Sequence, residues 1–324
     1  MSESHVWVYQ FSACIEKYCM HHPTVISIIP FCSGAGVKLA RFERDSEIDY
    51  GFIVGGMIVP HRAVGIELPQ TLDELAKSGN LVNQTFLSRI QRALAVAKDK
   101  LLLKEVRLLH PVERPGKIIC LGRNYLEHAL EGGNKPPKGL MIFLKPSTAL
   151  TGPYDPIIYP SITRELDYEG ELAVLIGKTV KSISREEAYS AIAGFMIMND
   201  VSARDIQLGD KQWTRGKGCD TFAPIGPWVT TKDEVPWPPK LYIKTWVNEE
   251  LRQDDNTSNM LRKVDEVIAH LSEGMTLEAG DIISTGTPQG VGYYMKPYPR
   301  LLNPGDKVRV EIERLGYIEN TVRA

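Results

Sequence analysis

The stretch ELDYEGELAVLIG, residues 165–177, decides how the rest of the sequence is interpreted. Asp167, Glu169 and Glu171 stand on alternate positions, and an apolar run follows them. Alternate residues of a β-strand share a face, so the three acids point to one side. The pattern predicts a single long strand that begins polar on one face and becomes buried.

Three carboxylates on one face of a strand need a partner or solvent. Carboxylates two positions apart lie roughly 6.5–7 Å from each other along a strand. Beside a core, their repulsion and desolvation are unfavourable. A divalent cation relieves both, because hard cations take clustered oxygen ligands. The alternative interpretation is a solvent-facing sheet edge, and this stretch alone does not decide between the two.

A second predicted buried strand, GFMIMND at 194–200, supplies another acid at its end. An acid in this place faces a cleft or a partner, or else caps the turn into VSARD. With Glu169 and Glu171, Asp200 would make a Mg²⁺ or Ca²⁺ site that keeps open positions. No His/Cys pair with zinc spacing lies in these segments, which favours a hard metal.

His128 and Glu131 are spaced to meet on the short helix predicted for RNYLEHALE, residues 123–131. A carboxylate beside an imidazole orients it and raises its basicity, which suits a general base. The Gly-Gly and Pro-Pro pairs that follow indicate a movable lid. An ordinary pair on a helix surface is the alternative interpretation.

Two lysines and a glycine-rich segment complete the candidate chemistry. Lys217 lies in the loop predicted for WTRGKGCDTF (213–222), and Lys145 ends a predicted strand. Either ammonium group could stabilise developing negative charge, or simply reach solvent. GTPQGVG (286–292) offers backbone N–H groups and Thr287 to an anion, but its spacing fits no nucleotide-binding fingerprint.

Elsewhere, strands joined by short turns outnumber helices, which predicts an α+β fold rather than βαβ repeats. Pro111 and Pro115 indicate a domain boundary. We therefore expect an unassigned extension at 1–36, a small N-terminal α/β domain at 37–112, and a second domain at 113–324. Strands are predicted at 37–43, 50–60, 117–122, 141–146 and 240–248, helices at 71–79, 82–103, 184–193 and 260–274, and a hairpin at 304–322.

The composition of the 324 residues is that of an ordinary globular protein, with 43% hydrophobic and 24% charged residues. A net charge of -2 gives no bulk attraction to nucleic acid or to anionic membranes. No apolar run reaches the length of about 18 residues that would suggest a membrane span. The five cysteines, Cys14, Cys19 and Cys32 among them, form no disulfide framework or zinc pattern. We expect a reduced cytoplasmic chain.

Taken together, seven stretches resemble the fumarylacetoacetate hydrolase superfamily, in particular its acylpyruvase and 2-hydroxyhepta-2,4-diene-1,7-dioate isomerase-like members. They run in the family's order from residue 117 to the C-terminal region: KIICLGRNYLEHALE, FLKPST, DYEGELAVLIG, NDVSARDIQ, WTRGKGCDTFAPIGPW, VNEELRQDDNTSNM and GDIISTGTPQGVG. The segment from residue 37 resembles the small N-terminal domain of many members. The resemblance implies a mostly β catalytic fold of mixed sheets at 113–324, and a homodimer.

The resemblance also implies roles for individual residues. A divalent metal, Mg²⁺ with Mn²⁺ or Ca²⁺ as alternatives, would be held by Glu169, Glu171 and Asp200. Asp167 is not a ligand in the family, so we predict that it supports the ligands. The catalytic positions are His128, Glu131 and Lys217, with the His–Glu pair on a lid. The positions that line the substrate pocket are Arg123, Lys145, Gln207 and Thr287.

These parts predict a metal-dependent hydrolase that cleaves a C–C bond of an acylpyruvate or a related 2,4-dioxo acid. The metal would stabilise a pyruvate enolate, while His128, oriented by Glu131, activates water and Lys217 binds the oxyanion. Three other reactions use the same enolate and stay open: oxaloacetate-type decarboxylation, hydroxy-dioate isomerisation and dehydration of a 3-deoxy-2-oxo sugar acid. A silent 2-oxo acid binder is a further alternative.

Overall fold

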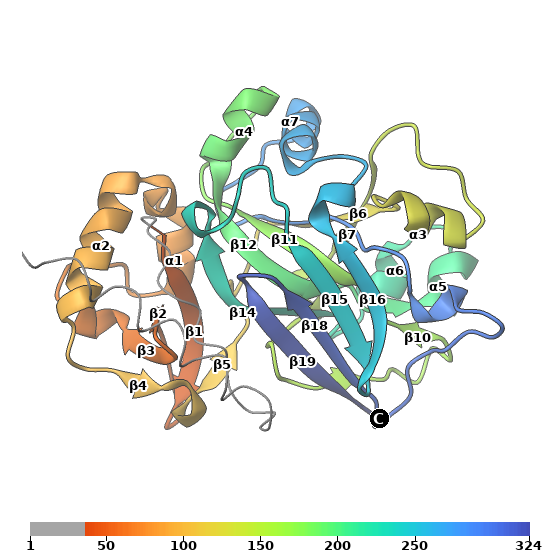
Figure 1. Cartoon of the computed structure of the whole chain (residues 1–324), viewed down its shortest axis with the longest axis horizontal. Helices are drawn as coiled ribbons and strands as arrows, with labels where there is room; N and C mark the ends of the chain where they lie inside the picture. Colours follow the sequence, from red (N-terminus) through yellow and green to blue (C-terminus); the bar gives the residue numbers. More distant parts are fainter. Residues whose placement is uncertain (1–35) are drawn as a thin grey trace, which may run out of the picture. The chain divides into compact units, whose positions relative to one another are not determined.

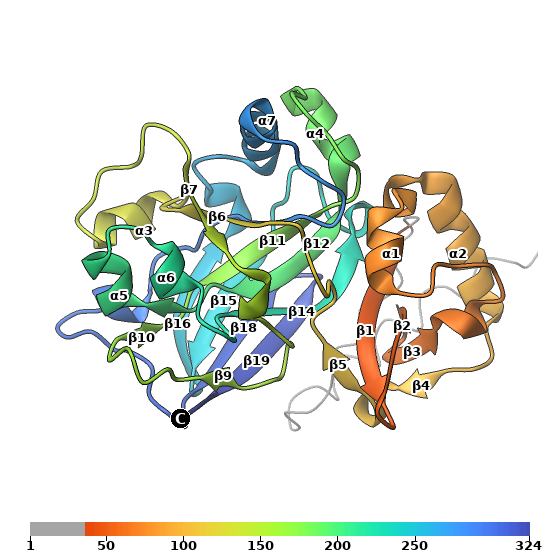
Figure 2. The same ribbon diagram turned by 180° about the vertical axis from the view of Figure 1, so that it is seen from behind.

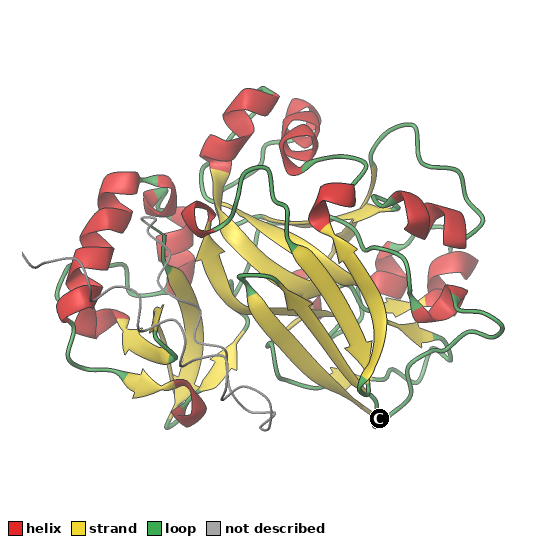
Figure 3. Ribbon diagram, in the orientation of Figure 1, coloured by secondary structure: helices red, strands yellow, loops and turns green. Residues whose placement is uncertain are grey.

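The computed structural model describes residues 36–324 of the chain. Within them, strands and helices form an α+β fold with mixed sheets, as the sequence predicts (Figure 3). The largest sheet has twelve strands. Its main path runs β4 (Leu101–Leu102), β3 (Met57–Pro60), β2 (Glu47–Val54), β1 (Lys38–Arg44), β14 (Ala223–Thr231), β12 (Ile192–Asn199), β11 (Gly170–Ile176), β17 (Ile282–Ser284), β6 (Ile118–Gly122) and β7 (Met141–Lys145).

Two shorter strands join this sheet from the side, and two smaller sheets complete the β structure. β5 (Arg107–Leu109) pairs with β1, and β8 (Leu150–Thr151) pairs with β14. The five-stranded sheet runs β16 (Glu250–Asn256), β15 (Tyr242–Val247), β18 (Lys307–Ile312), β19 (Gly316–Arg323) and β9 (Ile157–Ile158). β10 (Leu166–Asp167) and β13 (Ser202–Ala203) form a two-stranded sheet. Most pairs are antiparallel, but three are parallel: β17 with β6, β14 with β8 and β19 with β9.

The helices are short and lie around the sheets (Figure 1). They are α1 (Leu72–Lys77), α2 (Gln84–Val96), α3 (Leu126–Glu131), α4 (Arg185–Ala191), α5 (Arg204–Gly209), α6 (Thr214–Lys217) and α7 (Val264–Gly274). Single 3₁₀ turns occur at η1 (His61–Val64), η2 (Asn80–Val82), η3 (Leu103–Glu105), η4 (Ser147–Ala149), η5 (Lys232–Glu234), η6 (Thr257–Asn259) and η7 (Gly292–Tyr294). Figures 1 and 2 both show α3, α5 and α6 at the end of the large sheet that holds β6 and β7.

The centre of the core is formed by β11 and β12, in which every residue is buried. The second sheet contacts both strands, through β15 on β11 and through β18 and β19 on β12. Strands that are covered on both faces need apolar residues at nearly every position, which explains the runs LAVLI and IAGFMIM. Carboxylates placed at the ends of these two strands therefore lie beside a dry interior.

The prediction of one continuous strand at 165–177 is wrong. Tyr168 and Glu169 separate β10 from β11, and the two strands belong to different sheets. Side chains replace the missing ladder partners there, because Asn199 Oδ1 accepts from the Glu169 N–H at 3.0 Å. Gln253 Oε1 accepts from the Gly170 N–H, also at 3.0 Å. The break between the two strands therefore lies within the acidic stretch from Asp167 to Glu171.

Several other boundaries also differ from the predictions. The strand predicted at 50–60 is a hairpin of β2 and β3, since Gly55 and Gly56 turn the chain with φ of 56° and 79°. The helix predicted at 82–103 ends at Val96 because Ala97 is extended. The predicted loop 213–222 contains α6, and β14 and β16 were not predicted. The helix predicted at 184–193 is α4, which begins with a capping box of Ser184 and Glu187.

The predicted domain boundary falls between β5 and β6. β1 pairs with β14 through Lys38 and Thr230, so strands from both predicted domains share one sheet. The division into domains stays a prediction, and residues 1–35, with Cys14, Cys19 and Cys32, lie outside the described residues. Among residues 36–324, no helix has the length and apolar character needed to cross a membrane.

Candidate active site

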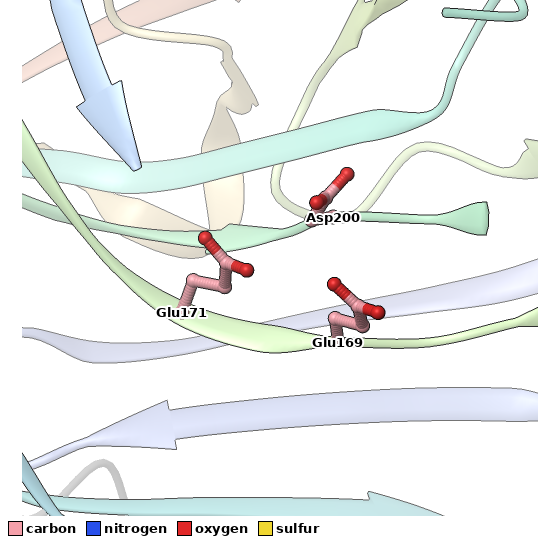
Figure 4. Close-up of side chains that lie close together, drawn as sticks. All are labelled: Glu169, Glu171 and Asp200. Carbon is pink, nitrogen blue, oxygen red and sulfur yellow. The ribbon is translucent and has the colours of Figure 1, made fainter. Parts of the chain in front are cut away.

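The carboxylates of Glu169, Glu171 and Asp200 converge where β11 begins and β12 ends. One oxygen from each lies within 4.8 Å of the others. Figure 4 shows the two glutamates on the side of the chain that faces Asp200. The backbone fixes this approach, because the Asp200 N–H donates to the Glu169 carbonyl at 2.8 Å. All three side chains are buried, so the solvent-facing interpretation of these acids is wrong.

Glu171 is the acid with the fewest positive neighbours. Its Oε2 accepts hydrogen bonds from the Ser284 hydroxyl and from the Gly286 N–H, the latter at 3.0 Å. Its Oε1 is buried and has no hydrogen-bond partner within the described residues. Burial, followed by the charges of Asp200 and Glu169, raises the pKa of the Glu171 carboxyl well above its ordinary value. This oxygen is the natural place for an additional cation.

Two buried lysines form ion pairs with the other two acids, Glu169 and Asp200. Lys217 Nζ lies 2.8 Å from both Glu169 Oε2 and Asp200 Oδ2. Lys145 Nζ lies 2.7 Å from Asp200 Oδ1. Burial alone would raise the pKa of Glu169, but the charges of Lys217 and Arg204 outweigh burial and hold this pKa below its ordinary range. Glu169 is therefore ionised in the folded protein.

Asp167 and Glu169 share one arginine. Arg204, the first residue of α5, places Nη2 2.7 Å from Asp167 Oδ2 and Nη1 2.7 Å from Glu169 Oε1. Gln207 Oε1 accepts from Arg204 Nη1 at 3.0 Å, one helical turn further on. The Asp167 carboxylate also accepts from the backbone N–H groups of Gly292 and Tyr293, at 2.9 and 3.1 Å. Asp167 thus links the segment that carries Glu169 to the loop that follows β17.

The residues present fit a divalent cation. The buried cluster combines four carboxylates with three cationic side chains, which leaves one excess negative charge when all are ionised: Asp167, Glu169, Glu171 and Asp200 against Lys145, Arg204 and Lys217. Oxygen ligands without thiolates or imidazoles suit Mg²⁺, Mn²⁺ or Ca²⁺. A cation beside the free Glu171 Oε1 would favour the ionised carboxylate. Each carboxylate has lone pairs enough to bind a cation and accept from a lysine together.

His128 and Glu131 meet as the sequence spacing predicts. His128 Nδ1 lies 2.7 Å from Glu131 Oε1, and the imidazole is buried. Glu131 Oε2 in turn accepts from the Gly290 N–H at 2.9 Å. Gly290 has φ +99° and comes so close to β16 that an added Cβ would lie 2.0 Å from the Arg252 carbonyl oxygen. A positive charge on protonated His128 would help to lower the pKa of Glu169, which places the pair near the acidic cluster.

The four predicted pocket residues differ in their contacts. Lys145 donates to the carbonyls of Val201, Phe222 and Lys217, which uses its three N–H donors, and it forms an ion pair with Asp200 Oδ1. The Thr287 hydroxyl donates to the Gly170 carbonyl and accepts from Gln253 Nε2. Gln207 holds Arg204. The half-buried Arg123 forms no ion pair with a carboxylate among the described residues, and the role of all four residues in substrate binding stays a prediction.

Arg204 and Ser284 are site residues that sequence reasoning missed. Arg204 lies inside NDVSARDIQ, four positions after Asp200, and buried acids require cations. The need of these buried acids for a cation could therefore have identified Arg204 from the sequence. Ser284 ends a buried strand with a small hydroxyl residue, and no pattern in the sequence connects it to Glu171.

Comparisons with known proteins were made once this geometry was established. The family profile described as Fumarylacetoacetate (FAA) hydrolase C-terminal matches residues 117–323. The chain is also 46% identical, over 270 residues, to the mitochondrial oxaloacetate tautomerase FAHD2B of Bos taurus. That alignment covers 83% of this chain and 84% of the bovine protein.

Two solved structures show the same fold. A fumarylacetoacetate hydrolase from psychrophilic Exiguobacterium antarcticum matches with a TM-score of 0.77 and 38% identity, covering 89% of this chain and 99% of the other. A maleylpyruvate hydrolase from Sphingobium sp. SYK-6, solved with a manganese(II) ion and pyruvate, matches with a TM-score of 0.73 and 35% identity. This match covers 88% of the present chain and 98% of the hydrolase.

Proposed function

Because the chain belongs to the fumarylacetoacetate hydrolase family, we propose that it is a divalent-metal-dependent tautomerase that interconverts the enol and keto forms of oxaloacetate. The 46% identity to the bovine oxaloacetate tautomerase supports this substrate over the acylpyruvates that the sequence first suggested. The observation that carries the chemistry is the convergence of three buried carboxylates within 4.8 Å, next to a His–Glu pair. Hydrolysis remains the second candidate.

Glu169, Glu171 and Asp200 would hold the cation, and we propose Mg²⁺, with Mn²⁺ as an alternative. When bound, it would supply Lewis-acid polarisation of the 2-oxo group of the substrate. The manganese(II) and pyruvate bound in the maleylpyruvate hydrolase structure support a divalent metal together with a 2-oxo acid.

His128 is the proposed base for the proton at C3. In the neutral imidazole, Nδ1–H donates to Glu131, which leaves the Nε2 lone pair free to accept a proton. Conversion of the keto to the enol form breaks one C–H bond at C3 and forms one O–H bond at the 2-oxygen. The C–H electron pair becomes the C=C bond, so the reaction needs no co-reactant. The reverse reaction returns the proton to C3.

Lys217 is the proposed donor to the developing negative charge on the 2-oxygen. Two of its three N–H donors are used by Glu169 and Asp200. The two carboxylates outweigh the effect of burial and raise the pKa of Lys217, so the ammonium group stays charged. A fixed, buried positive charge stabilises an enolate more strongly than solvent does.

Hydrolytic C–C cleavage is favoured by one specific observation, the intact His128–Glu131 pair. A pair of this kind can activate water, which tautomerisation does not require. The similarity to maleylpyruvate hydrolase, at 35% identity, supports the same candidate. Decarboxylation of oxaloacetate needs no base and is the third reaction to be distinguished.

One set of assays separates these reactions. Enol-oxaloacetate is followed by its ultraviolet absorbance, while pyruvate is measured with lactate dehydrogenase and NADH. The proposed tautomerase accelerates the loss of enol absorbance and forms no pyruvate above the spontaneous rate. Accelerated pyruvate formation from oxaloacetate would identify a decarboxylase, and pyruvate formed from acetylpyruvate would identify a hydrolase. Either result without enol–keto conversion contradicts the proposal.

We also propose that the protein acts as a homodimer in a reducing compartment. The dimer rests on the family resemblance, and a cytoplasmic location rests on cysteine usage. The name of the bovine relative places that protein in mitochondria, so the two compartments are alternatives. Light scattering after gel filtration tests the dimer, and a fluorescent fusion of the full chain tests the location.

A further inference from the structure

Asn124 is a buried polar residue that the proposed chemistry does not use. It lies between β6 and α3, and only 3% of it is exposed. Its Oδ1 accepts from the Arg262 N–H at 2.8 Å. Its Nδ2 donates to the Arg262 carbonyl at 3.1 Å and to the Thr285 carbonyl at 2.8 Å. Both N–H donors and the oxygen of the amide are therefore used inside the protein.

The Thr285 carbonyl belongs to the peptide group whose N–H bonds a predicted metal ligand. This peptide joins Thr285 to Gly286, and the Gly286 N–H donates to Glu171 Oε2 at 3.0 Å. In a trans peptide the carbonyl and the N–H point in opposite directions. The Asn124 amide and the Glu171 carboxylate therefore lie at the two ends of one peptide group.

Close packing holds this peptide group in place. Gly286 has φ +90°, a conformation that L side chains rarely adopt, and a Cβ added there would lie 2.8 Å from Asn124 Cβ. The Thr285 N–H and hydroxyl both donate to the Leu172 carbonyl, at 3.0 and 2.9 Å. The direction of the Gly286 N–H is therefore set by its neighbours before any metal binds.

We propose that Asn124 is a positioning residue, which orients the Glu171 carboxylate for the metal through this shared peptide group. A donor on the carbonyl fixes the peptide plane, polarises the group and strengthens its N–H as a donor. Glu171 Oε2 is held in this way, and the buried Oε1, which has no hydrogen-bond partner within residues 36–324, stays available to the cation. The inference rests on the metal site of the proposed function.

Titration with Mn²⁺ tests this role without any turnover. In calorimetric titration of metal-free protein, Asn124→Ala should bind Mn²⁺ ~3–10-fold more weakly, a smaller loss than for a group that contacts the ligand itself. Asn124→Leu removes the same donors, and its side chain has a similar size. It should show the same loss, and it replaces the alanine variant if the cavity prevents folding.

Asn320→Ala is the matched control, because the Asn320 amide is also buried and also donates to two carbonyls, those of Gly152 and Asp155. Both alanine variants should unfold at a lower urea concentration than the unmodified protein. Only Asn124→Ala should lose Mn²⁺ affinity, while Asn320→Ala should stay within about twofold. Equal losses of affinity in the two variants, or unchanged affinity in both Asn124 variants, would overturn the role of Asn124.

Two double variants separate orientation of Glu171 from a general loosening of the site. Ser284 donates to the same Glu171 oxygen, so Asn124→Ala with Ser284→Ala should lose at least ~3-fold more affinity than the product of the single losses. Asp167 acts on Glu169 through Arg204, so Asn124→Ala with Asp167→Asn should give that product within about twofold. A Ser284 double variant that equals the product would contradict the proposal.

The same proteins are assayed for enol–keto conversion of oxaloacetate, which distinguishes the two proposals. The predicted losses of Mn²⁺ affinity, in a protein that does not tautomerise oxaloacetate, would refute the proposed function and leave the role of Asn124 standing. Unchanged Mn²⁺ affinity of the Asn124 variants, in a protein that does tautomerise it, would overturn the role of Asn124 and leave the proposed function standing.

Discussion

Arg204 and Asp167 form a buried ion pair in which Nε and Nη2 of the guanidinium lie 2.8 and 2.7 Å from Asp167 Oδ2. The same guanidinium reaches Glu169 Oε1 through Nη1 at 2.7 Å. The pair therefore fixes a predicted metal ligand without placing Asp167 next to the metal. It also anchors the loop that follows β17, through the N–H groups of Gly292 and Tyr293.

The first prediction concerns the different roles of Asp167 and Glu169 in metal binding. Asp167→Asn should weaken Mn²⁺ binding by ~10–100-fold, the usual effect of losing a group that orients a ligand. Glu169→Gln should abolish measurable binding, because it removes a ligand oxygen. Calorimetric titration of metal-free protein with Mn²⁺ gives both affinities. If Asp167→Asn lost binding as completely as Glu169→Gln, Asp167 would itself be a ligand.

The Ser284 hydroxyl is predicted to orient the Glu171 carboxylate for metal binding. Ser284→Ala removes a donor to Glu171 Oε2 and leaves only the Gly286 N–H on that oxygen. Mn²⁺ affinity should fall by about 10-fold or more. Thr285→Ser is the matched control, since the Thr285 hydroxyl bonds the Leu172 carbonyl instead and is kept as a serine hydroxyl. Unchanged affinity in Ser284→Ala would show that this hydroxyl does not orient the ligand.

The His–Glu pair is predicted to act in catalysis. His128→Ala should lower kcat by ~10²–10⁴-fold, the usual contribution of a positioned base. Glu131→Gln should lower kcat less, because the amide can still bond the imidazole. Both variants should retain Mn²⁺ binding. Glu127→Gln changes an exposed glutamate one turn earlier on α3 and should have no effect. Full activity of His128→Ala in the enol assay would exclude His128 as the base.

Lys145 is predicted to stabilise the folded protein. Lys145→Met leaves Asp200 Oδ1 without its ion-pair partner and the Phe222 carbonyl without its donor, and both residues are buried. The free energy of unfolding should fall by about 3–5 kcal/mol, as when one partner of a buried ion pair is removed. Lys138→Met, at an exposed position, should stay within about 0.5 kcal/mol. Urea denaturation of metal-free protein measures both, and equal stability of the two variants would contradict this role.

Much of the fold could be predicted from local patterns. The runs that became β11 and β12 are apolar because both faces are covered, and their period and length are visible in the sequence. The hairpin at Gly55 and Gly56 was missed because two apolar strands around a Gly-Gly pair also resemble one strand. The break between β10 and β11 was missed for a different reason. Its backbone groups are satisfied by Asn199 and Gln253, which are distant in sequence.

In the candidate site, too, some contacts could be predicted from local sequence and others could not. Spacing alone could bring His128 to Glu131, because both lie on one helix. Glu171 and Ser284 come from paired strands that are more than a hundred residues apart, so only the sheet topology brings them together. The loop that follows β17 is fixed by Asp167, and local sequence carries no trace of that contact.

The central claim is that this chain tautomerises oxaloacetate with a divalent cation held by Glu169, Glu171 and Asp200. The most direct test follows enol-oxaloacetate absorbance with chelator-treated protein, before and after Mg²⁺ is restored, beside Glu171→Gln as the variant without a complete site. We predict catalysed enol loss only for the restored unmodified protein, with no pyruvate formed above the spontaneous rate. Undiminished catalysis after chelation, or catalysis by Glu171→Gln equal to that of the unmodified protein, would contradict the account.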